Sequence, residues 1–514
     1  MDCQTVYLNI AEMKLLPAQT SGNAWTRSAL LLERWLGQRA RLDNLMEDDG
    51  RNGPVLREST APALGRAGPV PAPFGEATVA GEEIREGQDR ARCQHLLYGT
   101  VRNFGRLEAL LGTAVPRRPR ARLQSVLLIA GFELLEAGPE ASLAGQDAKI
   151  VHNAVAQAKR LLSPAEVRLV NAVLRKVAGN PGLHAGPPSN GAGATDLARF
   201  YSHPEWLVQR WLAQFGAEAT VQLLNWNQVP APVYARWRGR SGGAAPVLPG
   251  ATVTAGAGDR LDPPAFLQPA PWKGFYIVSA GHWPEIEHLL ADGALYLQDP
   301  ATLTAPALLD PQAGETVVDL CAAPGGKSLL LADLLEQRLS ETGSAPGRVV
   351  SIDLPEPHRI DRLKENLAKA RRTDVVLVQA DVLKLTPRLL KDHNLPTGFS
   401  AILLDVPCSN TGVMRHRVDV KWRLRESDIA KHAVQQLAML EAAARLVAPG
   451  GRLVYSTCSL EQEENEEVVE AFLRASNGRF VLERTRSSRP WENGCDGAGA
   501  FLLRRSPQEG RTAR

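Results

Sequence analysis

Apolar residues recur at helical spacing through the first part of the chain. In residues 24–47, AWTRSALLLERWLGQRARLDNLME, they return about every 3.6 positions, which predicts an amphipathic helix. Further helical patterns follow from residue 86 to residue 179, where Ser163-Pro164 has the form of an N-cap with proline at the first helical position. No strand pattern interrupts these segments, so we expect an all-α domain over residues 24–180.

Segments without periodicity separate the patterned parts. Residues 49–85 are rich in proline, glycine and alanine, and residues 181–195 have a similar composition. Such stretches bury too little apolar surface to fold by themselves, so we predict a disordered insertion within the helical domain and a linker after it. Residues 1–23 and 506–514 are expected to form an N-terminal extension and a tail.

The pattern changes after the linker. Residues 196–300 mix short helical and strand-like runs, which predicts a small α+β subdomain. Over residues 301–505 short apolar runs, each ending in a polar or small residue, alternate with helical patterns. This alternation is typical of an α/β domain with a parallel, doubly wound sheet.

Side chains able to do chemistry follow the expected strands. In a doubly wound sheet the ligand lies beyond the carboxyl ends of the strands, so these side chains are candidates for one common site. They are Cys321, Asp353, Asp381, Asp405, Cys408 and Cys458.

The overall composition changes this picture only slightly. The chain has 514 residues and a formal net charge of +3, so bulk charge does not mark it as a nucleic-acid-binding protein. Its six cysteines are widely spread, which predicts neither a disulfide framework nor a metal site. No apolar run approaches the roughly 18–20 residues of a membrane helix, and the N-terminus does not resemble a secretory signal. We therefore expect a soluble, cytoplasmic protein.

Residues 317–328, VVDLCAAPGGKS, have the pattern of a strand, a glycine turn and the start of a helix. Gly325 and Gly326 allow the backbone to approach a ligand closely. The segment is not a phosphate-binding P-loop, because Cys321 stands where the P-loop needs its first glycine.

The acidic residues favour a positively charged nucleoside ligand. Asp353, at the end of the second strand, is placed to take ribose hydroxyls, and Asp381 after the third strand can meet an adenine amino group. Carboxylates without an opposing basic cluster suit S-adenosylmethionine, whose sulfonium is positive. The alternative is that both acids are ordinary strand-end caps, but their register with the glycine turn favours the ligand.

Cys408 and Cys458 have an inert and a reactive interpretation. Most free cysteines are small, buried and unreactive, but both of these follow expected strands on the ligand side, with Asp405 close before one of them. Beside a sulfonium methyl donor, a thiolate can add to carbon 6 of cytosine and make carbon 5 nucleophilic, helped by a carboxyl proton at ring nitrogen 3. Spacing alone does not choose which thiol is the nucleophile.

Long stretches of the chain resemble a known family. DLCAAPGGKS, LLDVPCSNTGVMRHRVDVKWR and LVYSTCSLEQEENEEVV resemble the Sun-type (Nop/Sun) RNA cytosine-5 methyltransferases. LYGTVRN, LLIAGFELL and RLVNAVLRKV resemble the NusB-like domain fused to the bacterial small-subunit ribosomal RNA members. The resemblance implies a Rossmann-like, S-adenosylmethionine-dependent methyltransferase domain after a NusB-like RNA-binding domain. Small-subunit ribosomal RNA is the first expectation for the substrate, and transfer RNA is the alternative.

The resemblance also implies roles for individual residues. Cys458 would be the nucleophile, Cys408 would help to release the product, and Asp405 would lie beside the cofactor and the target base. Asp353 would contact the ribose and Asp381 the adenine. No metal is implied, and we expect a monomer. The methionine part of the cofactor would lie against Cys321, Ala322, Ala323, Pro324, Gly325, Gly326 and Lys327.

Basic residues are the candidates for RNA contacts. The run VPRRPRARLQ contributes Arg117, Arg118 and Arg120, for which ordinary solvated surface is the alternative. Arg415 and Lys421 follow the Pro-Cys-Ser loop and are expected to meet phosphates beside a flipped base.

The chain departs from the family pattern near the same loop. Val418 stands where proline is usual, His416 replaces the second arginine after Gly-Val, and Ala500 stands where phenylalanine is common. These positions bear on the target nucleotide more than on the reaction. A non-catalytic RNA-binding factor and a DNA methyltransferase are the rival classes. The retained thiols and Asp405 argue against the first, and the helical domain argues against the second.

Overall fold

The computed structural model describes residues 22–46, 77–189, 191–239, 262–343, 345–370, 372 and 374–507. The chain divides into two compact units, Met1–Val221 and Gln222–Arg514, and each is described by itself. Among the described residues, no helix combines the length and the apolar character needed to cross a membrane.

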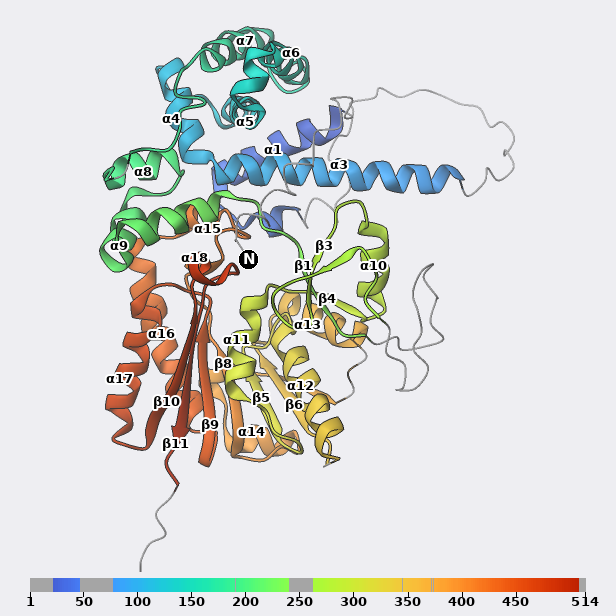
Figure 1. Cartoon of the computed structure of the whole chain (residues 1–514), viewed down its shortest axis with the longest axis vertical. Coiled ribbons are helices and arrows are strands. Elements are labelled where there is room, and N and C mark those ends of the chain that lie inside the picture. The colour runs from blue at the N-terminus through green and yellow to red at the C-terminus, as the bar shows by residue number, and fades with distance from the viewer. Residues whose placement is uncertain are drawn as a thin grey trace, which may run out of the picture. The chain divides into compact units, whose positions relative to one another are not determined.

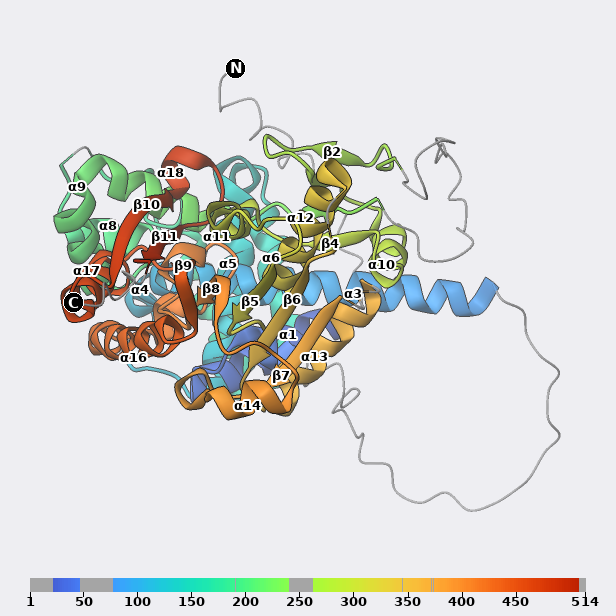
Figure 2. The ribbon, with the colours of Figure 1, turned by 90° about the horizontal axis from the view of Figure 1, so that it is seen from below.

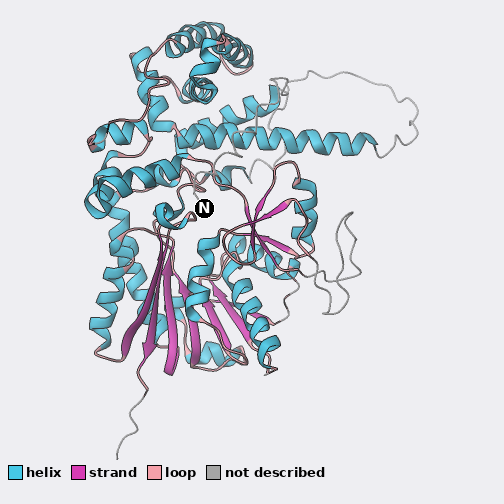
Figure 3. Cartoon of the chain, viewed as in Figure 1, coloured by secondary structure: helices cyan, strands magenta, loops and turns pink. Residues whose placement is uncertain are grey.

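The secondary-structure elements described in the first unit are helices (Figures 1 and 3). Its helices bury one apolar face in a core that includes Trp35, Leu97 and Leu127, which have almost no solvent exposure. The expected all-α domain is therefore confirmed. The helices are α1 (Gly22–Gln38), α3 (Ala77–Arg102), α4 (Phe104–Ala114), α5 (Ala121–Leu143), α6 (Gln146–Ala158), α7 (Pro164–Ala178), α8 (Ala194–Phe200) and α9 (Glu205–Gln228), whose last residues belong to the second unit.

Local sequence signals set the start of α7. The Ser163 hydroxyl accepts a hydrogen bond from the backbone N–H of Glu166, and the Glu166 carboxylate accepts one from the backbone N–H of Ser163. This reciprocal arrangement is a capping box, with Pro164 in the first turn. The predicted N-cap is confirmed.

The segment expected to be disordered, residues 49–85, lies partly outside the described residues. Helix α3 begins at Ala77, so its first turns replace the disorder expected for residues 77–85. Once a helix has a buried nucleus, each further residue adds a backbone hydrogen bond without a second nucleation cost. Composition alone does not reveal this extension.

A small antiparallel sheet lies near the start of the second unit. Its strands run in the order β2-β3-β1-β4, and Ile286 and Leu289 of helix α10 (Trp283–Ala291) pack against it with Ala235 and Leu295. This is the small α+β part that the sequence predicts. The strands are β1 (Tyr234–Trp237), β2 (Leu267–Pro269), β3 (Phe275–Val278) and β4 (Leu295–Leu297).

A seven-stranded sheet forms the rest of the second unit, in the order β10-β11-β9-β8-β5-β6-β7 (Figure 1). Strands β5 to β9 are parallel, whereas β11 is antiparallel to both of its neighbours, β9 and β10. The strands are β5 (Thr316–Leu320), β6 (Arg348–Asp353), β7 (Val375–Gln379), β8 (Phe399–Asp405), β9 (Val447–Thr457), β10 (Phe480–Ser488) and β11 (Ala498–Arg505).

The doubly wound α/β fold class is confirmed, with one difference at the sheet edge. The connection from β10 to β11 holds only the short helix α18 (Pro490–Asn493). A parallel crossover needs a dozen or more residues, so this short connection joins antiparallel strands and makes the sheet mixed.

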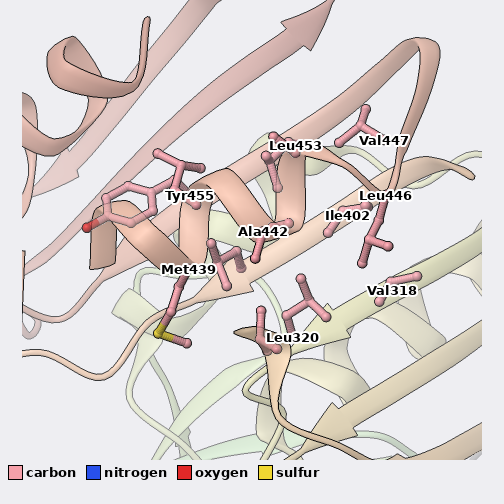
Figure 4. Close-up of a cluster of buried hydrophobic side chains, with 14 of the residues drawn as sticks. Val318, Leu320, Ile402, Met439, Ala442, Leu446, Val447, Leu453 and Tyr455 are labelled. Atoms are coloured by element: carbon pink, nitrogen blue, oxygen red, sulfur yellow. The ribbon is translucent and has the colours of Figure 1, made fainter. Parts of the chain in front are cut away.

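Helices cover both faces of the large sheet (Figure 2). Successive residues of β8 point to opposite faces, so Ile402 packs under α16 while Leu403 packs on the side of α11 and α12. Figure 4 shows Met439 and Ala442 of α16 among the strand residues of the same cluster, which include Leu320 and Leu453. The remaining helices are α11 (Thr304–Leu309), α12 (Gly326–Thr342), α13 (Pro357–Lys369), α14 (Pro387–Asp392), α15 (Val420–Arg423), α16 (Glu426–Ala444), α17 (Glu466–Ser476) and the short 3₁₀ helices η2 (Pro300–Leu303), η3 (Val382–Lys384), η4 (Thr411–Val413) and η5 (Gln462–Glu464).

Candidate active site

The predicted site residues lie at one edge of the large sheet. Each ends or closely follows one of the parallel strands β5 to β9, whose carboxyl ends share that edge. From β5 the chain adds β6 and β7 on one side and then returns to place β8 on the other side of β5. This reversal of strand order is the position at which open α/β sheets bind ligands.

The glycine turn after β5 has a backbone conformation and close packing that favour glycine at two positions. Cys321 and Gly325 have positive φ angles of 64° and 105°, and Gly325 is the residue that precedes α12. A Cβ on Gly325 would approach Leu363 to 2.8 Å, and one on Gly326 would approach the Gln298 amide nitrogen to 3.0 Å. Both approaches are tight for a Cβ, so glycine at these positions lets the turn and the start of α12 pack closely against Leu363 and Gln298.

Asp405 joins the glycine turn to β8 and β9. Its carboxylate accepts hydrogen bonds from the Lys327 ammonium and the Ser456 hydroxyl, both at 2.7 Å. Burial alone would lower the pKa of Lys327, but the Asp405 carboxylate outweighs burial and raises that pKa. Lys327 is therefore a fixed positive charge beside the Asp405 side chain at the strand reversal.

Asp353 and Asp381 differ in how many hydrogen bonds their carboxylates already accept from the protein. The Asp353 carboxylate is buried and accepts hydrogen bonds from the backbone N–H groups of Ala323 and Leu354 and from two nitrogens of Arg359. These four bonds use the acceptor capacity of a carboxylate, so a ribose would have to displace one of them. Asp381 caps η3 through the backbone N–H of Leu383.

The two thiols form a close pair. The Sγ atoms of Cys408 and Cys458 lie 3.0 Å apart, one following β8 and the other following β9. Cys408 is buried, whereas Cys458 is partly exposed and lies 3.3 Å from the Asn410 amide oxygen. The hydrogen bond with Cys458 raises the pKa of the Cys408 thiol well above its ordinary value, and burial adds to this effect. Cys408 therefore holds its proton, and Cys458 is the thiol that a substrate can reach.

Glu464 positions both thiol loops, which are the loops that carry Cys408 after β8 and Cys458 after β9. The sequence did not indicate this role. The buried Glu464 carboxylate accepts hydrogen bonds from the backbone N–H of Ser409 at 2.9 Å and from the Ser459 hydroxyl at 2.5 Å. Ser409 also donates its hydroxyl to the same carboxylate, and Gln436 donates its amide at 3.0 Å. Because Ser409 and Ser459 directly follow the two cysteines, one acid positions both. The acidic run after Cys458 looks like solvated surface, so no sequence signal singles out this residue.

The expected RNA contacts of the second unit do not fit this structure. Arg415 is 4% exposed, donates to the backbone carbonyls of Val229 and Pro230, and stacks 4.0 Å from the centre of the Trp226 ring. Lys421 is 1% exposed. Both side chains are buried in this structure, so neither presents its charge at the surface where a phosphate could bind. The positions of Arg415 and Lys421 in the sequence after the Pro-Cys-Ser loop do not indicate that both side chains are buried.

The basic run of the first unit is on the surface. Arg117 and Arg118 are exposed, and Arg118 donates to Glu108 at 3.3 Å. Arg120 donates two hydrogen bonds to Glu166 and lowers the pKa of that carboxyl to about 2. Arg120 is thus paired, while Arg117 is the most available cation of the three, and RNA binding by this run stays a prediction.

The glycine turn, the carboxylates at the strand reversal and the paired thiols together define an α/β methyltransferase preceded by a helical domain. Residues 306–505 match the family described as 16S rRNA methyltransferase RsmB/F, and residues 74–179 match the NusB family. The chain belongs to the 16S rRNA methyltransferase RsmB/F family, with a NusB domain before the methyltransferase domain.

Curated relatives and a solved structure resemble most of the chain. A probable ribosomal RNA small subunit methyltransferase B from Bacillus subtilis is 30% identical over 78% of this chain and 83% of its own length. Ribosomal RNA small subunit methyltransferase B from Vibrio cholerae is 32% identical over 86% of this chain and 95% of its own. The crystal structure of PH0851 has a TM-score of 0.66 over 93% of this chain and 98% of that chain, with 21% identity, and supports the fold alone.

Proposed function

We propose that the enzyme methylates carbon 5 of a cytosine in RNA through a covalent bond between Cys458 and carbon 6, with S-adenosylmethionine as methyl donor. The similarity to ribosomal RNA small subunit methyltransferases favours small-subunit ribosomal RNA as the substrate. The observation that carries the proposal is the thiol pair, with an accessible Cys458 3.0 Å from a buried, protonated Cys408.

The residues at the strand reversal suit S-adenosylmethionine. Gly325 and Gly326 allow the backbone of the turn to come close to a ligand, and Asp405 and Asp353, which pair with Lys327 and Arg359, lie at the same edge of the sheet. Asp319 lies beneath the turn with one buried carboxylate oxygen that has no hydrogen-bond donor among the described residues. When bound, the sulfonium supplies an electrophilic methyl group. We expect residues 321–327 to hold its methionine part, Asp353 its ribose and Asp381 its adenine.

Cys458 is the group that we expect to activate the base. Its sulfur forms a bond to carbon 6, the carbon 5–carbon 6 double bond breaks, and a proton supplied at ring nitrogen 3 balances the electron pair. Carbon 5 then forms a bond to the methyl group as the methyl–sulfonium bond breaks and leaves a neutral thioether. Loss of the proton from carbon 5, cleavage of the bond between carbon 6 and the Cys458 sulfur, and return of the nitrogen 3 proton to its donor restore the aromatic ring and the free Cys458 thiolate.

Charged and thiol groups surround Cys458. The Lys327 ammonium is close enough to Cys458 for the two groups to interact electrostatically. Asp405 lies at the same edge, where we expect it to contact the target base. We assign the release step to Cys408, because its sulfur is the protein group nearest to the reacting thiol that can exchange a proton with the product.

The rival substrates and classes predict different outcomes. Transfer RNA would use the same chemistry at the same residues, so only the identity of the labelled RNA separates the two substrates. A non-catalytic RNA-binding factor would bind RNA without transferring a methyl group. A DNA methyltransferase would label DNA.

The test is methyl transfer from labelled S-adenosylmethionine to deproteinised small-subunit ribosomal RNA, transfer RNA and DNA, followed by nucleoside analysis. We expect label in 5-methylcytosine of the ribosomal RNA, no label with Cys458→Ala, and a denaturation-resistant protein–RNA adduct with Cys408→Ala. Cys93→Ala serves as the matched control, because Cys93 is a buried cysteine of the first unit, outside the site. Full methylation by Cys458→Ala would refute the assignment of the nucleophile.

A further inference from the structure

Three potential metal ligands from distant parts of the second unit meet beside the thiol loops. Asp299 precedes η2, His416 lies between η4 and α15, and Asp496 lies between α18 and β11. The His416 Nε2 atom is 3.5 Å from Asp299 Oδ2 and 3.4 Å from Asp496 Oδ2. One ligand atom from each residue lies within 4.8 Å of the others. The proposed methylation chemistry makes no use of this cluster.

Hydrogen bonding alone leaves the cluster unsatisfied. An imidazole Nε2 donates one proton, yet it faces two carboxylates at distances longer than the usual 2.7–3.2 Å of a protein hydrogen bond. Asp496 is 4% exposed, and its Oδ1 atom has no hydrogen-bond donor among the described residues. A buried carboxylate oxygen without a donor is costly, so this atom indicates a partner that side chains do not provide.

The separations suit a metal ion better than a hydrogen bond. Two ligand atoms that each lie about 2.0–2.2 Å from a zinc ion at a tetrahedral angle are about 3.3–3.6 Å apart. The two measured separations, 3.4 and 3.5 Å, fall within this range. One imidazole and two carboxylates are common ligands of first-row divalent cations. The His416 side chain is 37% exposed, whereas the two acids are almost covered, so a water molecule can reach a fourth position from the histidine side.

The surrounding charges include two that oppose a cation. Arg415 and Arg417 are near enough to interact electrostatically with Asp496 and would repel a metal ion. Arg415 is already engaged by two backbone carbonyls and the Trp226 ring, so its charge is shared with other groups.

We propose that Asp299, His416 and Asp496 bind a divalent first-row cation, for which Zn²⁺ is the chemically preferred ion. The ion connects the β4–η2 loop, the η4–α15 loop and the β10–β11 connection. The backbone N–H of Gly497, next to Asp496, donates to the Gly412 carbonyl at 2.8 Å, and the Gly412 N–H donates to the Cys458 carbonyl at 3.0 Å. The metal therefore stabilises the backbone that supports the thiol pair, without touching the reacting atoms.

The test measures metal binding directly, so it does not depend on the reaction proposed above. Full-length protein is stripped with a chelator, and Zn²⁺ binding is then measured by calorimetry and by metal analysis after dialysis. A Cys408→Ala/Cys458→Ala background removes the thiol pair as a competing zinc site. Co²⁺ provides a second probe, because its visible spectrum distinguishes nitrogen and oxygen ligands from thiolates.

Two variants separate a metal site from an ion-pair cluster. His416→Arg keeps a positive side chain between the acids but cannot ligate a metal, and Asp496→Asn removes the unpartnered carboxylate. We expect one Zn²⁺ per chain in the background protein, and an affinity at least about tenfold lower in both variants. His393→Arg, a change at an exposed histidine elsewhere, should bind as the background protein does.

Zn²⁺ should also raise the thermal unfolding midpoint of the background protein and of His393→Arg, but not that of His416→Arg. Absence of Zn²⁺ binding to the background protein, or equal affinity in His416→Arg, would overturn the proposal. In that case the three residues form a buried ion-pair cluster. Circular dichroism of each variant establishes that a loss of binding is not a loss of fold.

Discussion

The sulfur atoms of Cys408 and Cys458 lie 3.0 Å apart although 50 positions separate the two residues in the chain. Each follows one of two neighbouring parallel strands, β8 and β9, so the sheet register brings the two loops together. The covered thiol retains its proton and the partly exposed thiol is accessible. A covalent nucleophile has to be accessible to the substrate, and a partner that exchanges a proton has to carry one.

The short distance between the thiols predicts that mild oxidation links them. A disulfide bond is about 2.05 Å long, so the sulfur atoms need to approach by only about 1 Å. Diamide takes two electrons and two protons from the pair and is itself reduced. We expect loss of methylation that dithiothreitol restores, and a linked Cys408–Cys458 peptide in the mass spectrum. The control variant Cys93→Ala should be inactivated at the same rate as wild type, whereas an irreversible loss without that peptide would contradict the prediction.

Glu464 is predicted to position the thiol loops. Glu464→Gln keeps the shape of the side chain but replaces one acceptor oxygen with a donor facing Ser409 or Ser459. We expect kcat to fall by at least about tenfold and the free energy of unfolding to fall by about 1–3 kcal/mol. Binding of S-adenosylmethionine should change little, because Glu464 contacts the thiol loops.

A purely structural role for Glu464 would leave thiol chemistry unchanged. The rate of Cys458 alkylation as a function of pH therefore decides the matter, and we expect its profile to shift in Glu464→Gln. Glu466→Gln, at an exposed acid on the same segment, is the matched control and should retain the wild-type profile. An unchanged profile in Glu464→Gln would remove the positioning role.

Asp405 is predicted to act in the chemical step. Asp405→Asn retains the size of the side chain but replaces one of the two oxygens that accept hydrogen bonds from Lys327 and Ser456 with an amide NH₂. Removal of a group that supports proton transfer costs typically about 100-fold or more, so single-turnover methylation should slow by at least that factor. Affinity for S-adenosylmethionine, measured by calorimetry, should fall by a smaller factor. A methylation rate within a few-fold of wild type would exclude this role.

Asp319 is predicted to make stability decrease as the pH rises from about 4 to about 7. Burial raises its pKa to about 7, and its Oδ2 atom accepts a hydrogen bond from Ser328 at 2.5 Å. The folded protein keeps this proton at pH values where the unfolded chain has already released it, so raising the pH favours the unfolded state. The contribution is up to about 4 kcal/mol, lost progressively across this window.

Urea unfolding of wild type, Asp319→Asn and Asp361→Asn at pH 5 and pH 8 checks this pH dependence. Asp319→Asn has no proton to lose, so its stability should change less between the two pH values than that of wild type. Asp361→Asn, at an exposed position, should follow wild type. Equal pH dependence in wild type and Asp319→Asn would show that Asp319 does not titrate in this range.

Much of the fold is encoded in local patterns. The strands β5 to β9 and the capping box at Ser163 each depend on residues that are close in sequence, so periodicity and capping chemistry predict them. The rule that ligands lie beyond the carboxyl ends of parallel strands then places Asp405, Cys408 and Cys458 at one edge. The antiparallel strand β11 and the early start of α3 at Ala77 were missed, because pairing and helix propagation depend on neighbours beyond a local window.

The sequence by itself determined the two domain types, the glycine turn and the set of candidate catalytic and cofactor-binding residues at the edge of the sheet. Only the tertiary structure decided which of them meet. It placed Cys408 against Cys458, brought Glu464 beneath both loops, buried Arg415, and assembled the Asp299–His416–Asp496 cluster. These are contacts between segments far apart in the chain, and they depend on strand order, loop path and burial. Local patterns carry no information about those three quantities, whereas side-chain reactivity depends on all of them.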